Sequence, residues 1–153
     1  MTMTAKKGAR EIVKDFEDWS AMPYKDIAGI WTIGWGHKIL PGEDFSNGIT
    51  REQGENLLSQ DMQFAENAVN YYISAPVTQN MYDALVSFVF NVGAQAFVNS
   101  TLLKKINAGD YSGASQEFAR WKYITIDGQK VVSNGLVNRR AKESSLFQEG
   151  MTA

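Results

Sequence analysis

Residues 81–92 are apolar on nearly every side of a helix. Their sequence, MYDALVSFVFNV, holds one charged side chain, that of Asp83. A helix without a polar face is stable only where other elements cover it on all sides. We therefore expect this segment at the centre of a helical bundle, with Thr78 as its N-terminal cap and Gly93 at its end.

The preceding part of the chain changes from helical to strand periodicity. Apolar residues at helical spacing predict a helix over residues 8–19, which Pro23 stops. Large and small residues alternate over residues 31–35, which predicts a strand. Thr50 and Gln53 then form a capping-box pattern that opens a helix of about 20 residues, or roughly 30 Å, which is long enough to link two lobes.

The remaining sequence predicts helices and one hairpin. Residues 100–109 and 111–121 predict two short helices, and residues 136–147 predict a closing helix. An Asp-Gly pair between two β-prone runs in residues 122–132 is typical of a β-hairpin. The predicted fold class is therefore α+β and mostly helical, with a small β-containing N-terminal lobe, a long connecting helix and a larger helical C-terminal lobe.

The length of 153 residues corresponds to one domain. We expect this domain to span residues 1–153, with lobes at approximately residues 13–60 and 61–150. The first helix is expected to pack with the C-terminal lobe.

The residue types present exclude several kinds of site. The chain has no cysteine, so it has no disulfide, no cysteine-ligated zinc and no thiol nucleophile. Its single histidine, His37, leaves no histidine-rich metal site. A formal net charge of −2 does not indicate a nucleic-acid partner.

Charge is unevenly distributed along the chain. Residues 43–103 hold seven acidic residues and one basic residue, whereas residues 104–142 hold eight basic and three acidic residues. Two interpretations of this asymmetry stay open. The charges lie on solvated helical faces, or the basic half contacts an anionic partner. The N-terminal residues lack the apolar core of a signal peptide, and no apolar run of about 18 residues occurs, so we expect neither an ordinary secretory signal nor membrane insertion.

Carboxylates are the main candidates for chemistry in a chain with this composition. Glu17 lies at the end of the first predicted helix, Asp26 in the turn before the strand and Thr32 on the strand. A helix end, a turn and a strand can meet at one cleft, where two carboxylates in different surroundings can act as acid and base, as glycoside hydrolysis requires. The chain has 17 acidic residues, so spacing alone does not distinguish this pair from surface charge.

The residues around these positions resemble the signature of phage-type lysozymes, glycoside hydrolase family 24. Eight residues separate Glu17 from Asp26, five separate Asp26 from Thr32, and an Ile-Gly-Trp-Gly-His run follows at once. The resemblance continues through the apolar helix and the closing helix and covers about residues 10–147. Asp18 departs from the family, which commonly has glycine there; a second negative charge can raise the pKa of Glu17 or crowd the site.

The resemblance implies a lysozyme-like two-lobed fold and a muramidase that hydrolyses the β-1,4 bond between N-acetylmuramic acid and N-acetylglucosamine in peptidoglycan. Glu17 would be the general acid. Asp26 would stay ionised to support positive charge on the sugar or to activate water, and Thr32 would hold that water. Inversion at the anomeric carbon is expected from the family's usual behaviour. This chemistry needs carboxylates and water, so no metal and no cofactor is implied.

The resemblance also implies roles outside the catalytic set. His37 is expected to pair with Asp61 and to tie the small lobe to the long helix, with a catalytic role as the alternative. Arg140 is expected close to the catalytic glutamate, with a solvated helix face as the alternative. Phe90 and Asn91 are expected at the substrate cleft, where Asn91 either binds substrate or caps the end of its helix.

Taken together, these features imply an endolysin that degrades host peptidoglycan and causes lysis. It is expected to be a monomer that stays in the host cytoplasm until a holin opens a route to the periplasm and cell wall. Two alternatives stay open: a lytic transglycosylase, which cleaves the same bond without water, and a catalytically inactive peptidoglycan-binding module.

Overall fold

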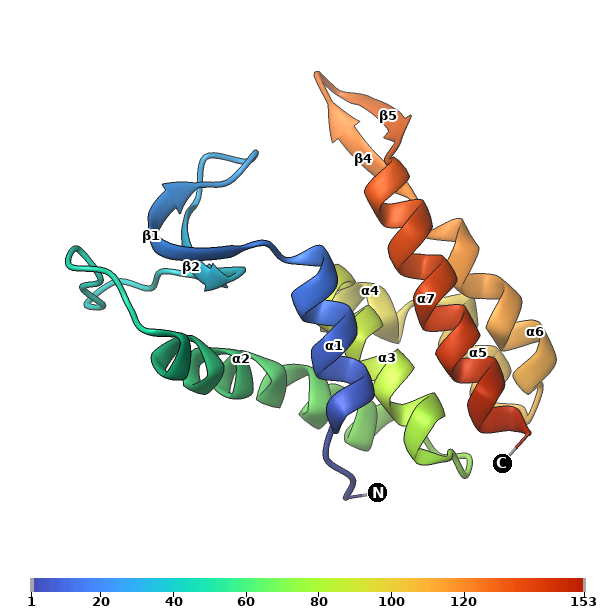
Figure 1. Cartoon of the computed structure of the whole chain (residues 1–153). Coiled ribbons are helices and arrows are strands. Elements are labelled where there is room, and N and C mark those ends of the chain that lie inside the picture. The colour runs from blue at the N-terminus through green and yellow to red at the C-terminus, as the bar shows by residue number, and fades with distance from the viewer. Residues whose placement is uncertain (1, 153) are drawn as a thin grey trace.

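A computed structural model describes residues 2–152 of the chain. The chain is mostly helical with two small antiparallel sheets, which confirms the α+β fold class (Figure 1). The helices are α1 Lys7–Phe16, α2 Arg51–Tyr72, α3 Gln79–Val92, α4 Ala94–Val98, α5 Thr101–Asn107, α6 Tyr111–Glu117 with a 3-10 turn at Phe118–Arg120, and α7 Asn134–Met151. The strands are β1 Trp19–Lys25, β2 Trp31–Trp35, β3 His37–Lys38, β4 Tyr123–Ile126 and β5 Gln129–Val132. No helix within residues 2–152 combines the length and apolar character needed to cross a membrane.

Helix α3 lies at the centre of the helical part, as its apolar sequence predicts. Every residue from Met81 to Val89 is buried, and α1, α2 and α7 pack around the helix (Figure 1). Thr78 begins it by accepting a hydrogen bond from the backbone N–H of Met81. Gly93 ends it with a φ of 92°, which glycine adopts without strain. The helix therefore gives the other helices a common apolar surface.

Helix α2 connects the three-stranded sheet to the helical core. Thr50 and Gln53 form the predicted capping box, and the helix then runs for 22 residues. It contacts β2 and β3 at the sheet and α3 and α4 in the helical core. This long helix thus spans both parts of the molecule (Figure 1).

Helix α1 is shorter than its sequence pattern predicts, and the extension to residue 19 is wrong. The helix ends at Phe16, and Glu17 already has extended backbone angles. Trp19 begins β1 and packs against Trp35 of β2, with the ring centroids 4.4 Å apart. Gly54 of α2 leaves room for the Trp19 ring, which a side chain at that position would overlap. Burial of this aromatic pair favours a strand over another helical turn.

The small sheet has the order β1-β2-β3, and both pairings are antiparallel. The β1–β2 register shifts between Ser20 and Tyr24, and Pro23 lies in this interval, where the ladder does not need its missing N–H. Pro23 is therefore part of a strand and not a helix stop. On β2, Trp31 is 51% exposed whereas Trp35 is 7% exposed, so one tryptophan belongs to the core and the other faces solvent.

The C-terminal region contains the predicted hairpin and a longer closing helix. Strands β4 and β5 pair around Asp127 and Gly128, both with positive φ (Figure 1). Ser133 caps α7, which continues to Met151, beyond the end of the predicted helix over residues 136–147. The sequence pattern misses α4, a helix of five residues.

His37 connects β3 to α2 through carboxylates. Its Nδ1 lies 2.8 Å from Oδ2 of Asp61, and its Nε2 lies 2.9 Å from Oε1 of Glu43, a partner that the sequence did not indicate. Burial lowers the pKa of His37, but its hydrogen bonds with Glu43 and Asp61 outweigh burial, so the pKa is raised. Below this raised pKa His37 is an imidazolium whose two ring nitrogens donate hydrogen bonds to Asp61 of α2 and to Glu43, which ties the sheet to the helix.

We predict that His37→Asn lowers Tm by roughly 4 to 8 °C near pH 7, because about 2 kcal/mol of charged hydrogen bonding is lost. A raised folded-state pKa means that this stabilisation is complete below the unfolded pKa of about 6.5 and is lost as pH rises through the folded pKa. Burial raises the pKa of Asp61 although the His37 contact opposes this, so the folded protein also binds a proton at Asp61 more readily than the unfolded chain does, and this contribution is likewise lost as pH rises.

Thermal denaturation of wild type, His37→Asn and Asp61→Asn across neutral to alkaline pH checks this prediction. Asp61→Asn should lose less stability than His37→Asn, because the Glu43 contact of His37 remains, and both differences from wild type should shrink as His37 deprotonates. A Tm difference that stays constant with pH would contradict the imidazolium, and loss of turnover at unchanged Tm would contradict the structural role.

Candidate active site

Glu17 lies where α1 ends and the backbone turns toward β1. Its backbone N–H still donates to the carbonyl of Val13, 2.7 Å away, so the helix fixes the position of this residue. The side chain reaches the backbone of Gly36, between β2 and β3. A Cβ at Gly36 would lie 2.7 Å from Oε2 of Glu17, and the φ of Gly36 is +75°. Glycine in the Gly-Trp-Gly-His run therefore leaves room for the Glu17 carboxyl group.

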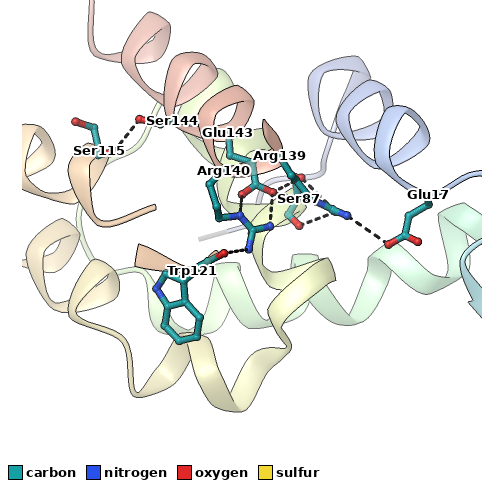
Figure 2. A network of polar contacts seen from close by, with 8 residues as sticks. All are labelled: Glu17, Ser87, Ser115, Trp121, Arg139, Arg140, Glu143 and Ser144. Carbon is teal, nitrogen blue, oxygen red and sulfur yellow. Dashed lines mark hydrogen bonds and ion pairs between the residues drawn. The ribbon is translucent and has the colours of Figure 1, made fainter. Parts of the chain in front are cut away.

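Burial has the largest effect on the Glu17 carboxyl group, and it raises the pKa. Arg139, whose Nη1 lies 3.3 Å from Oε1 of Glu17, lowers the pKa, as does the charge of Lys38 (Figure 2). Asp18 adds a smaller increase in pKa. The net effect is a raised pKa, so Glu17 keeps its proton to higher pH than an exposed glutamate.

Asp26 lies in the turn between β1 and β2, in the opposite environment. Its Oδ1 accepts hydrogen bonds from the backbone N–H groups of Ile30 and Ala28, at 2.8 and 2.9 Å. Its Oδ2 lies 3.2 Å from Nζ of Lys38. These contacts, the Ile30 hydrogen bond first among them, outweigh desolvation and lower the pKa of Asp26. Asp26 is therefore ionised at pH values where Glu17 still holds its proton.

Thr32 lies on β2, opposite Tyr24 of β1. Its side chain is buried, and its hydroxyl donates to the carbonyl of Ile30 at 2.9 Å. Ile30 thus holds two of the three predicted catalytic residues, because its N–H binds Asp26 and its carbonyl binds Thr32. Because the Thr32 hydroxyl donates its proton to the carbonyl of Ile30, its oxygen can accept a hydrogen bond from another molecule.

The structure places Arg139, and not Arg140, beside Glu17, so the expected position of Arg140 is wrong. Arg140 instead has its Nε 2.7 Å from Oε1 of Glu143, and its guanidinium lies 5.1 Å from the ring centre of Phe88. Both arginines are buried, so neither belongs to a solvated helix face. Successive helix residues point about 100° apart. Only one of the two can therefore face Glu17.

Lys38, Ser87 and Glu143 also belong to this set of polar residues, and the sequence did not single them out. Lys38 contacts Asp26. Ser87 on α3 and Glu143 on α7 hold the inner side of Arg139 (Figure 2). Glu143 has one local signal, since it follows Arg139 at the i, i+4 spacing of helical ion pairs. Lys38 and Ser87 act through tertiary contacts, which no spacing rule identifies.

The expected substrate-binding residues lie in different places. A pocket of about 690 Å³ lies against the β4–β5 hairpin, and Asn91 and Arg140 both line it. Glu17 and Asp26 do not line this pocket. Phe90 is also outside it and stacks on Phe64 of α2, with the ring centroids 6.3 Å apart. Asn91 is exposed, so its amide is available at the pocket.

Known proteins are similar to this chain in sequence and in fold. The family model for Phage lysozyme matches residues 14–143. The chain is similar to an endolysin of Acyrthosiphon pisum secondary endosymbiont phage 1, with 42% identity over 137 residues, which are 90% of this chain and 92% of that protein. It is also similar to the solved endolysin from Escherichia coli O157:H7 phage FAHEc1, with a TM-score of 0.89 and 39% identity over 96% of this chain and 94% of that one. The muramidase domain of SpmX from Asticcacaulis excentricus matches with a TM-score of 0.87 and 35% identity, over 95% of this chain and 98% of that one. The chain belongs to the phage lysozyme family.

Proposed function

We propose that this phage lysozyme is an endolysin in which Glu17 protonates the leaving oxygen of the β-1,4 bond between N-acetylmuramic acid and N-acetylglucosamine. The contrast between two carboxyl groups carries the proposal, because burial raises the pKa of Glu17 while hydrogen bonds lower that of Asp26. A protonated and an ionised carboxyl group at one pH are what an acid and its partner require. The names of the similar proteins, two endolysins and a muramidase domain, support this substrate.

Asp26 and Thr32 bind the attacking water in this proposal. The water donates one hydrogen to the Thr32 oxygen, whose own proton is held by Ile30, and the other to the Asp26 carboxylate. As the water oxygen bonds to the anomeric carbon, Asp26 takes a proton, and the glycosidic bond breaks with proton transfer from Glu17 to the leaving oxygen. Attack on the face opposite the leaving group inverts the anomeric carbon.

Arg139 acts on the product of the proton transfer. Once Glu17 has lost its proton, its carboxylate lies 3.3 Å from the Arg139 guanidinium, which stabilises the new charge. Beyond the reacting sugars, Phe90 and Asn91 contact the glycan from α3, and Arg140 supports the pocket that Asn91 shares.

Glu17→Gln tests the role of the acid. Incubation with purified peptidoglycan should release soluble fragments with reducible muramic acid ends from wild type, detected by mass spectrometry. The variant should be slower by about 10²- to 10⁴-fold, since it keeps the shape of the site without a transferable proton. Glu11→Gln, an exposed glutamate on the same helix, is the matched control and should retain activity.

The products also distinguish the alternatives. Fragments lighter by one water would identify a lytic transglycosylase and contradict the roles of Asp26 and Thr32. No fragments from folded wild type would identify a binding module. Proton NMR of the first anomer formed at the new reducing end should show α for inversion, and β would show retention.

We also propose that the protein is a monomer that reaches the cell wall through lesions made by a holin. One chain supplies Glu17, Asp26, Thr32 and Arg139, so the site needs no second copy. Expression in a bacterial host should leave cells intact without a holin and lyse them with one, and Glu17→Gln should not lyse them in either case. Lysis by the protein alone would contradict the route, and a solution mass above 17.0 kDa would contradict the monomer.

A further inference from the structure

Glu143, on the inner side of α7, is the centre of a buried group of charges next to the catalytic acid (Figure 2). Its side chain is 0% exposed. Its Oε2 accepts hydrogen bonds from Oγ of Ser87 at 2.6 Å, from Nη2 of Arg140 at 3.2 Å and from Nε of Arg139 at 3.3 Å. Its Oε1 lies 2.7 Å from Nε of Arg140. One carboxylate is thus shared by two guanidinium groups.

Arg139 is the member of this group that reaches the catalytic residue. Its Nε binds Glu143 and its Nη1 binds Glu17, while its Nη2 donates to the backbone carbonyl of Ser87 at 3.1 Å. The guanidinium is therefore fixed on three sides, by α7 itself, by α3 and by the end of α1. Because it is 2% exposed, water does little to screen its charge.

We propose that Glu143 is a positioning residue of the catalytic site, which offsets the charge of the Arg139 guanidinium beside Glu17 and so limits how much of that positive charge acts on Glu17. The inference rests on the proposed role of Glu17 as the acid. Glu143 does not touch the reacting atoms, and it acts only through Arg139.

The two neighbours of Arg139 act in opposite directions. Glu143 compensates the charge of Arg139, which leaves Glu17 able to keep its proton. Arg140 binds the same Glu143 carboxylate, so less of that negative charge offsets the positive charge of Arg139. Removing the Glu143 charge should therefore favour the ionised form of Glu17, and removing the Arg140 charge should favour its protonated form.

The other groups that face Glu17 come from the N-terminal part of the chain and stay the same in both variants. Asp18 faces it from the turn before β1, Tyr24 from β1 and Lys38 from β3. Asp26 lies beyond Lys38. A change confined to α7 thus tests the arginine group alone.

The pH dependence of kcat/KM on purified peptidoglycan tests the proposal. Activity falls on the alkaline side of the pH profile as the acid loses its proton. The position of this fall, the alkaline limb, therefore reports the pKa of Glu17 in the free enzyme. Glu143→Gln should move this limb to lower pH by about half a unit to one unit, and Arg140→Met should move it to higher pH by a similar amount. Methionine keeps an apolar contact with Phe88 in place of the guanidinium. Glu149→Gln, an exposed glutamate on the same helix, should leave the limb in place.

Opposite shifts would support the positioning role, because a merely structural contact would lower Tm in both variants without moving the limb in opposite directions. Shifts in the same direction, or none, would overturn it. If Glu143→Gln does not fold, Arg140→Met decides the question alone, since an unmoved or lowered limb contradicts the proposal. Activity retained by Glu17→Gln would instead contradict the role of Glu17.

Discussion

The hydrogen bond from Arg139 to Glu17 joins residues 122 positions apart, from the last helix to the end of the first. Two buried arginines on α7 are costly unless their charges are compensated. Glu143 compensates them from within the helix, Ser87 adds a hydroxyl and a carbonyl from α3, and Glu17 contributes a carboxyl group from α1. The packing of α1, α3 and α7 therefore has to satisfy these polar groups as well as bury apolar surface. The same contacts position Glu17, the proposed catalytic acid.

The opposite pKa shifts of Glu17 and Asp26 follow from where the backbone places the two carboxyl groups. Glu17 sits at a helix end with the backbone of Gly36 against its carboxyl group, and burial disfavours its charge. Asp26 sits in an exposed turn whose N–H groups point at its carboxylate and favour its charge. The Ile30 backbone couples the position of Asp26 to that of Thr32. Local backbone geometry thus shifts the pKa values of Glu17 and Asp26 in the opposite directions that the proposed acid and base require.

Much of this fold could be predicted from the sequence because its signals are local. The capping box at Thr50, the cap at Thr78 and the Asp-Gly turn of the hairpin each involve residues a few positions apart. The end of α1 could not be predicted, because packing between Trp19 and Trp35 decides it across the sheet.

The site shows the same division between local and tertiary signals. The family motif predicts Glu17, Asp26 and Thr32, and the structure gives each a distinct environment. The motif does not indicate which of two adjacent arginines faces Glu17, because that depends on how α7 is rotated against α3. Nor does it indicate Glu43, which reaches His37 from the loop before α2.

The most direct test of this account is the titration of the two carboxyl groups themselves. Carbon-13 NMR of the side-chain carboxyl carbons, assigned with Glu17→Gln and Asp26→Asn, gives the pKa of each group in the folded protein. The account predicts a pKa for Glu17 above its ordinary 4.5 and a pKa for Asp26 below its ordinary 3.8. A Glu17 that titrates at or below the pKa of Asp26 would contradict the assignment of acid and base.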